Sequence, residues 1–221
     1  MSSLSNLVMI KKLLFIAIAL PTLAFVTSFN TINKDKGVKV GKKAPLLDTK
    51  MEGIDGNSYA LNDLMKENGL LVVFSCNTCP FVVGNDNFEG WERQYNDLHV
   101  MAEKASIGIV LVNSNEGKRD GADSKDAMIK HAKEAGYTMN YVVDSNSELA
   151  DAFGAKTTPH FFAIDAKGKV AFMGSIDNSW DSARTELETY ALNVIEHLSD
   201  GTDLKVNSSK PRGCSIKRKK D

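Results

Sequence analysis

Cysteine, histidine and net charge are all scarce in this chain of 221 residues. It holds three cysteines and four histidines, and its formal net charge at pH 7 is −1. Three cysteines are too few for a disulfide scaffold, so they indicate one reactive pair and one further thiol. The near-zero charge argues against a nucleic-acid binder or a strongly basic membrane-surface protein. A hydrophobic content of 43% is ordinary for one globular domain with tails.

Two of the cysteines, Cys76 and Cys79, stand three positions apart directly after an apolar run. The run, 70–74, predicts a buried strand, and the residues from 81 towards 98 predict a helix. At such a turn we expect the backbone N–H groups of the new helix to favour the thiolate form of Cys76. A thiolate can attack a disulfide or a peroxide, and Cys79 is close enough to displace the mixed intermediate.

Two other interpretations of the Cys-x-x-Cys motif compete with redox chemistry. The first is a pair of unrelated buried thiols. The second is a zinc knuckle, which needs a second Cys or His pair. No such pair is formed by the remaining candidates, which are Cys214, His99, His131, His160 and His197. Redox chemistry is therefore favoured, and neither a metal nor an organic cofactor is expected, because the cysteine pair carries the two electrons.

The N-terminal segment predicts export from the cytoplasm. Lys11 and Lys12 precede the apolar stretch 13–29, which ends near small residues. This pattern predicts a signal peptide over 1–28. A retained single-helix anchor is the alternative, although the stretch is marginal for ~30 Å of hydrocarbon. In either case we expect a periplasmic or membrane-anchored protein facing the periplasm, with a linker over 29–42.

The order of apolar runs indicates an α/β domain. The runs 70–74 and 106–113, separated by a helix, predict a βαβ unit and hence a parallel sheet. A helix, a strand, a helix, a hairpin and an amphipathic helix should follow, over 126–135, 141–143, 146–153, 161–164 with 170–173, and 184–198. One domain is therefore expected over 43–200, followed by a basic tail, 201–221, that contains Cys214.

This order of elements, with the two cysteines at the first βα junction, resembles the thioredoxin fold. The resemblance becomes specific at Thr157, Thr158 and Pro159, which stand directly before a predicted strand. In thioredoxin-like proteins the corresponding proline is cis and lies against the cysteine pair. The resemblance therefore implies that Pro159 shapes the substrate site and that the backbone of Thr158 pairs with an extended substrate segment.

Further segments resemble the redoxin branch of this superfamily, similar to TlpA and ResA, and the peroxiredoxin-like proteins that carry Cys-x-x-Cys. They are 41–45, 55–56, 112–115 and 213–217. The resemblance implies a central mixed sheet with helices on both faces, an extra βα insertion and an N-terminal hairpin. Peroxiredoxins proper place a proline and a threonine ahead of their reactive cysteine, whereas Val73 stands three residues before Cys76.

The resemblance implies an extracytoplasmic thiol–disulfide oxidoreductase, with Cys76 as the attacking thiolate and Cys79 as the resolving thiol. Its partners would be protein thiols or disulfides and a protein that donates or accepts electrons, with no nucleic acid and with a possible membrane tether at the N-terminus. A peroxiredoxin-like thiol peroxidase and a non-enzymatic redox-sensing module are the alternatives that remain open.

Three further residues have open assignments. His160 either faces the disulfide and biases the Cys76 thiolate, or is turned by strand alternation to a buried or solvent-facing side. Cys214 is a resolving thiol, a partner for another protein, or an inert residue packed by Ile216. Trp180 is a candidate to flank a binding groove.

Overall fold

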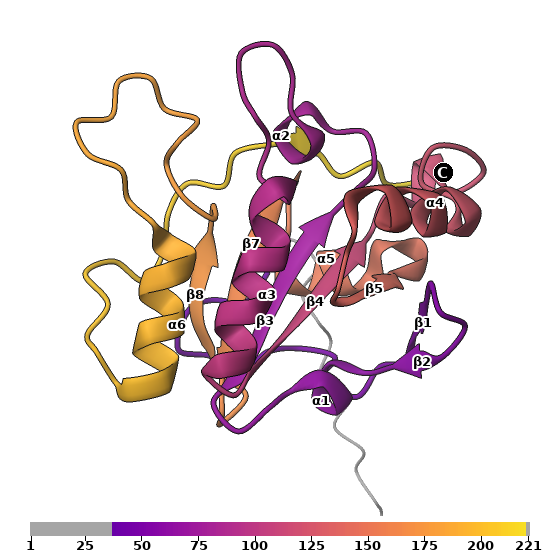
Figure 1. Ribbon diagram of the computed structural model, residues 1–221. Helices are drawn as coiled ribbons and strands as arrows, with labels where there is room; N and C mark the ends of the chain where they lie inside the picture. The colour runs from indigo at the N-terminus through magenta and orange to yellow at the C-terminus, as the bar shows by residue number, and fades with distance from the viewer. Residues whose placement is uncertain (1–36, 220–221) are drawn as a thin grey trace, which may run out of the picture. The chain divides into compact units, whose positions relative to one another are not determined.

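The computed structural model describes residues 37–219, and a seven-stranded mixed sheet forms its centre (Figure 1). The order across the sheet is β2-β1-β5-β4-β3-β7-β8. β3, β4 and β5 run parallel, whereas β1 is antiparallel to β5 and β7 is antiparallel to β3 and β8. The strands of this sheet are β1 Met51–Gly53, β2 Ser58–Tyr59, β3 Gly69–Ser75, β4 Ile107–Asn113, β5 Asn140–Val143, β7 His160–Asp165 and β8 Val170–Gly174. A separate ladder joins β6 (Thr157–Thr158) to β9 (Cys214–Ser215).

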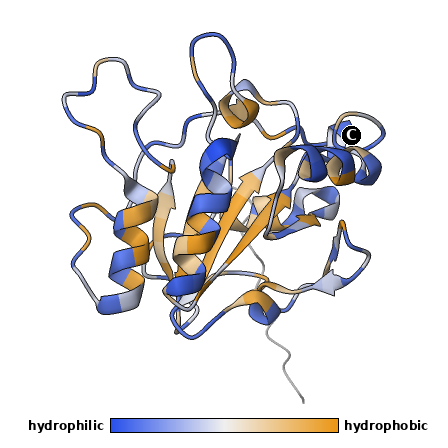
Figure 2. Ribbon diagram, viewed as in Figure 1, coloured by the Kyte–Doolittle hydropathy of each residue, from blue (hydrophilic) through white to orange (hydrophobic). Residues whose placement is uncertain are grey.

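Helices cover both faces of the sheet, as predicted for this fold class. They are α1 Leu61–Leu64, α2 Pro80–Val83, α3 Tyr95–Lys104, α4 Lys125–Ala135, α5 Glu148–Phe153 and α6 Tyr190–Asp200. Side chains of α2, α3, α4 and α6 belong to the core on one face, and those of α1 and α5 to the core on the other. Figure 2 shows the strands between them as the most hydrophobic part of the domain.

The buried strand β3 explains why both faces need cover. All seven of its residues are buried. Leu71 and Val73 contribute to the core beneath α3 and α6, while Leu70 and Val72 contribute to the core on the opposite face. Each fully buried aliphatic side chain of this kind contributes about 1.5–3 kcal/mol. The continuous apolar run in the sequence is therefore the signature of a strand covered on both sides.

Two additions to the central βαβ unit also agree with the prediction. The N-terminal hairpin of β1 and β2 turns at Asp55 and Gly56, and its first strand pairs with β5 at the sheet edge. The extra strand–helix segment is β5 with α5, which precedes the hairpin of β7 and β8.

The prediction of a single helix from 81 towards 98 is wrong. α2 has only four residues and ends at Gly84, whose φ is 93°. The side-chain oxygen of Asn85 then accepts the backbone N–H groups of Asn87 and Phe88, which fixes a tight turn. The chain becomes helical again only near Tyr95. Positive φ at glycine and the preference of asparagine for turns are the reasons for the interruption.

The last helix begins later than predicted, at Tyr190 rather than near 184. The preceding loop is closed by Asn178, whose backbone N–H donates to the carbonyl of Glu188 and whose side chain accepts the Glu188 N–H. Leu187, which falls within the helix predicted over 184–198, therefore lies in the loop with 57% of its surface exposed.

Within the described residues, the domain extends beyond its predicted limits of 43 and 200. At the start, the N–H of Val38 donates to the carbonyl of Phe153, and that of Gly41 to the carbonyl of Val170. At the end, β9 joins the fold and Ile216 is buried in the core, with only 5% of its surface exposed. The predicted signal peptide and the linker as far as 36 lie outside the described residues. Among residues 37–219, no helix is both long and apolar enough to cross a bilayer.

The turn that separates α2 from α3 gives a test of backbone packing. Gly90 has φ 77°, and a Cβ built there would lie 2.3 Å from the carbonyl oxygen of Val82. Gly56 has φ 86° but nothing within 4 Å of a built Cβ. An L-residue in this conformation costs about 1–2 kcal/mol. Gly56→Ala should lose about that much stability in urea unfolding, and Gly90→Ala clearly more. Equal losses would show that the turn does not lie tightly against α2.

Candidate active site

The cysteine pair lies where β3 ends and α2 begins (Figure 1). Cys76 follows the last residue of β3, and Cys79 is the residue that caps α2, with Pro80 in its first turn. Proline is favoured at this position because it has no N–H to leave unpaired and its φ is already helical. The start of the helix is therefore beside Cys79, whereas the sequence had predicted it beside Cys76.

Both sulfurs contact Thr158, the last residue of β6. The Sγ of Cys76 lies 3.1 Å from the Thr158 hydroxyl oxygen, and the thiol of Cys79 donates to the Thr158 carbonyl oxygen at 3.0 Å. The peptide bond between Thr158 and Pro159 is cis, which confirms the conformation predicted from the resemblance. Only 2% of Cys76 and 4% of Cys79 is exposed. The structure thus brings together all four residues predicted for the catalytic and substrate-binding site.

Hydrogen bonding shifts the pKa values of the two thiols in opposite directions. The bond from the Cys76 thiol is the main cause that lowers the pKa of Cys79; burial opposes it, and donors of Cys214 and Phe81 reinforce it. The same sulfur–sulfur bond, together with burial, raises the pKa of Cys76. A thiolate gains most where most donors converge, and they converge on Cys79. In its protonated form Cys79 donates to Thr158 instead, so it has a partner in either state.

The hydrogen bonds of the reduced pair therefore favour the opposite order to the predicted roles. The sequence placed the activated thiolate on Cys76, on the assumption that the helix starts there. In the structure the backbone N–H of Phe81, in the first turn of α2, lowers the pKa of Cys79. Cys76 lies three residues earlier, and fewer donors hydrogen-bond its sulfur, namely the hydroxyl of Thr158 and the N–H of Thr78. Cys79 is the better placed nucleophile.

A buried polar network, which the sequence did not reveal, fixes the tip between the cysteines. The backbone N–H of Asn77 donates to Asp123, and its side-chain oxygen accepts the hydroxyl of Tyr141. Asp123 also accepts the side-chain amides of Asn113 and Asn115. These two asparagines lie in the segment 112–115 that resembles the peroxiredoxin-like proteins, which was the available signal. The network holds the cysteine loop against β4 and β5.

His160 does not face the cysteines. Its ring lies 4.5 Å from that of Phe162, a residue of the core on the opposite face of the sheet. Its Nδ1 accepts the backbone N–H of Lys156, and its Nε2 has no partner among the described residues. Burial lowers the pKa of His160 to about 3, with a smaller contribution from Lys156. Strand alternation has therefore selected the buried side, and His160 stays neutral.

The C-terminal segment crosses the site. In β9, Cys214 pairs with Thr158, and its backbone N–H lies 3.4 Å from the Sγ of Cys79. The guanidinium of Arg212 lies 5.3 Å from the ring of Phe81, in α2, and 5.0 Å from that of Trp180. Trp180 therefore packs on this chain's own tail, and its place beside a binding groove stays a prediction.

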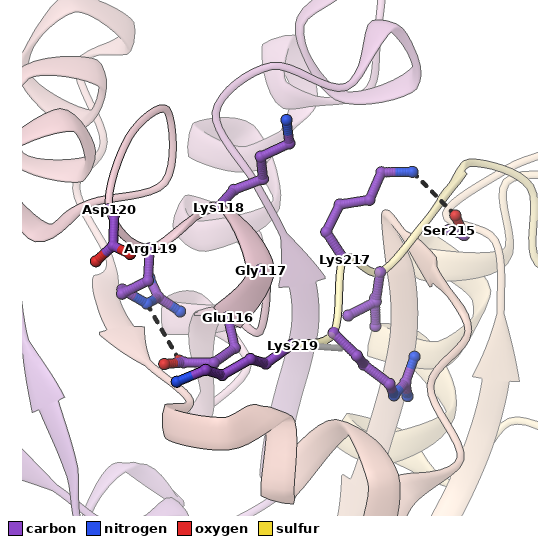
Figure 3. Close-up of a pocket in the computed structure, with 10 residues that line it drawn as sticks. Glu116, Gly117, Lys118, Arg119, Asp120, Ser215, Lys217 and Lys219 are labelled. Atoms are coloured by element: carbon purple, nitrogen blue, oxygen red, sulfur yellow. Dashed lines mark hydrogen bonds and ion pairs between the residues drawn. The ribbon is translucent and has the colours of Figure 1, made fainter. Parts of the chain in front are cut away.

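A solvent-facing hollow lies beyond Cys214, between residues 116–120 and 215–219 (Figure 3). Its volume is about 870 Å³. Figure 3 shows Lys118 and Lys217 extending from its two sides, and the Lys217 ammonium donates to Ser215 at 3.0 Å. None of its lining residues contacts the sulfur of Cys76 or Cys79. Within the part of the chain that the structure describes, no group of three or more His, Cys, Asp and Glu side chains could hold a metal ion.

A mixed sheet with a Cys-x-x-Cys turn beside a cis-proline defines a thioredoxin-like protein. Residues 39–190 match the family model described as Redoxin, so the chain belongs to the redoxin family. Among curated proteins, the thiol-disulfide oxidoreductase ResA of Geobacillus thermodenitrificans (strain NG80-2) is 24% identical over 165 residues, which cover 73% of this chain and 84% of that protein.

Solved structures agree on the fold. An uncharacterized conserved protein from Geobacillus kaustophilus superposes with a TM-score of 0.70 and 28% identity, over 83% of this chain and 94% of that one. A hypothetical protein from Sinorhizobium meliloti 1021 superposes with a TM-score of 0.68 and 23% identity, over 83% and 96% of the two chains. The latter likeness shows the fold alone.

The environment of His160 predicts a pH dependence of stability. The folded pKa lies below the unfolded value of about 6.5, so the unfolded chain binds the proton first and stability falls as the pH drops below that value. Between pH 7 and pH 5 this histidine should cost about 2 kcal/mol. His160→Phe keeps an aromatic ring beside Phe162 and should remove that part of the pH dependence in urea unfolding. An unchanged dependence would show that His160 is not buried as a neutral ring.

Proposed function

We propose that this redoxin is a thiol–disulfide oxidoreductase that uses Cys76 and Cys79 as its redox pair. The observation that carries the proposal is the contact of both sulfurs with Thr158, next to the cis-proline. A hydrogen-bonded pair of thiols in this position can close to a disulfide and pass two electrons to another disulfide. The similarity to a relative named thiol-disulfide oxidoreductase supports the same chemistry.

The chemistry needs only the two cysteines and a protein substrate. In the reducing direction, the Cys79 thiolate attacks one sulfur of a substrate disulfide and the other sulfur leaves as a thiolate. Cys76, after losing its proton to the leaving thiolate, attacks the Cys79 sulfur, and the second substrate sulfur leaves as a thiolate that takes up a proton from water. The substrate gains two electrons and the pair becomes a disulfide, which an electron-donor protein reduces again. The same steps in reverse oxidise a substrate dithiol.

We further propose that this exchange takes place outside the cytoplasm, in the periplasm or at its membrane. The support is the sequence at the N-terminus, where Lys11 and Lys12 precede the apolar stretch 13–29. Protein disulfides, the substrates of such exchange, persist in that compartment. Protease treatment of spheroplasts should degrade the protein, and full protection from the protease would place it in the cytoplasm.

Insulin reduction and peroxide consumption, measured on the same protein, separate this function from its alternatives. The proposed oxidoreductase reduces insulin disulfides with dithiothreitol as the electron source, and Cys79→Ser abolishes the reaction. A peroxidase would consume hydrogen peroxide faster than it reduces insulin. A binding module would do neither.

The order of attack gives the sharpest prediction. With Cys214→Ser in every protein, so that no third thiol resolves the intermediate, the additional change Cys76→Ser should accumulate mixed disulfides with protein substrates through Cys79. Attack survives in that variant while resolution is lost. The matched Cys79→Ser variant should trap little. Non-reducing gels with mass spectrometry measure both, and stronger trapping by Cys79→Ser would restore Cys76 as the nucleophile.

A further inference from the structure

The strand β9 occupies the edge of the site that an extended substrate would use. Thr158 pairs with Cys214 in an antiparallel ladder, at the residue whose carbonyl oxygen contacts Cys79. The backbone N–H of Cys214 donates to the Cys79 sulfur at 3.4 Å, and the Cys214 side chain contributes to the lowered pKa of Cys79. We propose that Cys214 is a third redox-active cysteine, which forms a disulfide with Cys79 while β9 is docked. The inference rests on the proposed redox function of Cys79.

Glycine at position 213 is what allows this approach. A Cβ built on Gly213 would lie 2.2 Å from the carbonyl oxygen of Thr158 and 3.1 Å from the nitrogen of Pro159. Any side chain there would push the strand away from the cysteines. The residue before Cys214 is thus fitted to the backbone of the cis-proline turn.

The strand is anchored on both sides of Cys214. Before it, Arg212 lies over the rings of Phe81 and Trp180. After it, Ile216 is buried in the core and its N–H donates to the carbonyl of Lys156. Arg218 pairs with Asp151 at 2.6 Å.

A second close approach lies at the hollow of Figure 3, where the tail passes Gly117. The N–H of Gly117 donates to the carbonyl of Lys217 at 2.6 Å, and a Cβ on Gly117 would lie 2.7 Å from the carbonyl oxygen of Arg218. The N–H of Lys217 donates to the side chain of Asn115 at 2.8 Å. Together these contacts hold Cys214 beside the Cys79 sulfur. Its thiol therefore has the high effective concentration of an intramolecular partner.

The proposed exchange balances without a further reactant. When the pair is oxidised, the Cys214 thiolate attacks the Cys79 sulfur, the Cys76–Cys79 bond breaks and Cys76 leaves as the thiolate. A proton moves from Cys214 to Cys76, and the number of disulfides stays at one. The reverse reaction returns the disulfide to the pair. In the reduced protein, burial raises the pKa of Cys214 to about 11, with the hydrogen bond to Cys79 as the second cause, so Cys214 remains the protonated donor to Cys79.

This arrangement means that Cys214 and β9 control the access of protein substrates to Cys79. Cys76 and Cys79 are both buried while β9 is docked, so a protein substrate that pairs with Thr158 must first displace β9. A disulfide between Cys79 and Cys214 would hold β9 in place and keep Cys79 from that substrate until Cys76 releases it.

The test is disulfide mapping of the full-length Cys76→Ser protein after treatment with oxidised glutathione. Two moles of glutathione leave as the thiol for each Cys79–Cys214 disulfide formed. Trypsin places Cys79 in the peptide 67–93 and Cys214 in the peptide 213–217, so the disulfide links two peptides and is read by mass. We expect the linked peptide in most of the Cys76→Ser protein and little Cys76–Cys214 linkage in the matched Cys79→Ser protein. A Cys79–glutathione adduct with Cys214 free would overturn the proposal.

Two glycine variants in the Cys76→Ser background test whether the docking of β9 directs formation of the Cys79–Cys214 disulfide. Gly213→Ala should reduce the linked peptide several-fold and raise the glutathione adduct of Cys79, because the strand can no longer approach. Gly121→Ala is the control, since the nearest atom to its built Cβ is 4.0 Å away. Equal linkage in both would show that docking of β9 does not direct the reaction.

Wild-type protein equilibrated in a glutathione redox buffer provides a second measurement that needs no variant of the pair. Rapid acid quenching and alkylation should capture a minor linked peptide beside the Cys76–Cys79 form, and its complete absence would also count against the proposal. Insulin reduction is scored separately. Linkage without insulin reduction would refute the proposed function alone, whereas insulin reduction without linkage would refute the role of Cys214 alone.

Discussion

The position of Thr158 against the cysteines is the constraint on which the rest of the site depends. Through its hydroxyl, its carbonyl and its strand pairing, Thr158 contacts all three cysteines of the chain. The antiparallel register of the sheet places it there. Phe74 of β3 pairs with His160 of β7, so the residues just after Phe74 lie opposite those just before His160. The cysteine turn and the cis-proline turn therefore meet at one end of the sheet.

The surrounding structure holds the cysteine turn from its other side. The buried carboxylate of Asp123 fixes Asn77, and the asparagines at the end of β4 share that carboxylate. A buried carboxylate is costly unless its oxygens are hydrogen-bonded, and here both are. The polar network thus sets the position of the tip, while α2 and the tail set the surroundings of the sulfur.

Much of the fold could be predicted because its signals are local. The buried runs of β3 and β4, the helix α4 and the hairpin of β7 and β8 are all visible in the sequence, and the structure has each of them. The split between α2 and α3 was missed, because Gly84 and Gly90 matter through close backbone contacts that composition alone does not reveal.

The site was predicted less completely than the fold. The two cysteines and the cis-proline could be found from their spacing, but the order of reactivity depends on which residue caps α2, a boundary that shifts by three residues. The docking of the tail on the domain was missed because the tail's polar, basic composition is typical of a solvated segment. Its docking depends on one buried side chain, Ile216, and on the absence of a side chain at Gly213, and both act at long range along the chain.

Ultraviolet titration of the thiolate tests the central claim, that Cys79 carries the first negative charge of the pair. The reduced wild-type protein should show an absorbance step well below the ordinary cysteine pKa of about 8.5. The step should remain in Cys76→Ser, whose hydroxyl still donates to Cys79, and disappear in Cys79→Ser. A low-pH step that survives in Cys79→Ser and is lost in Cys76→Ser would contradict the account.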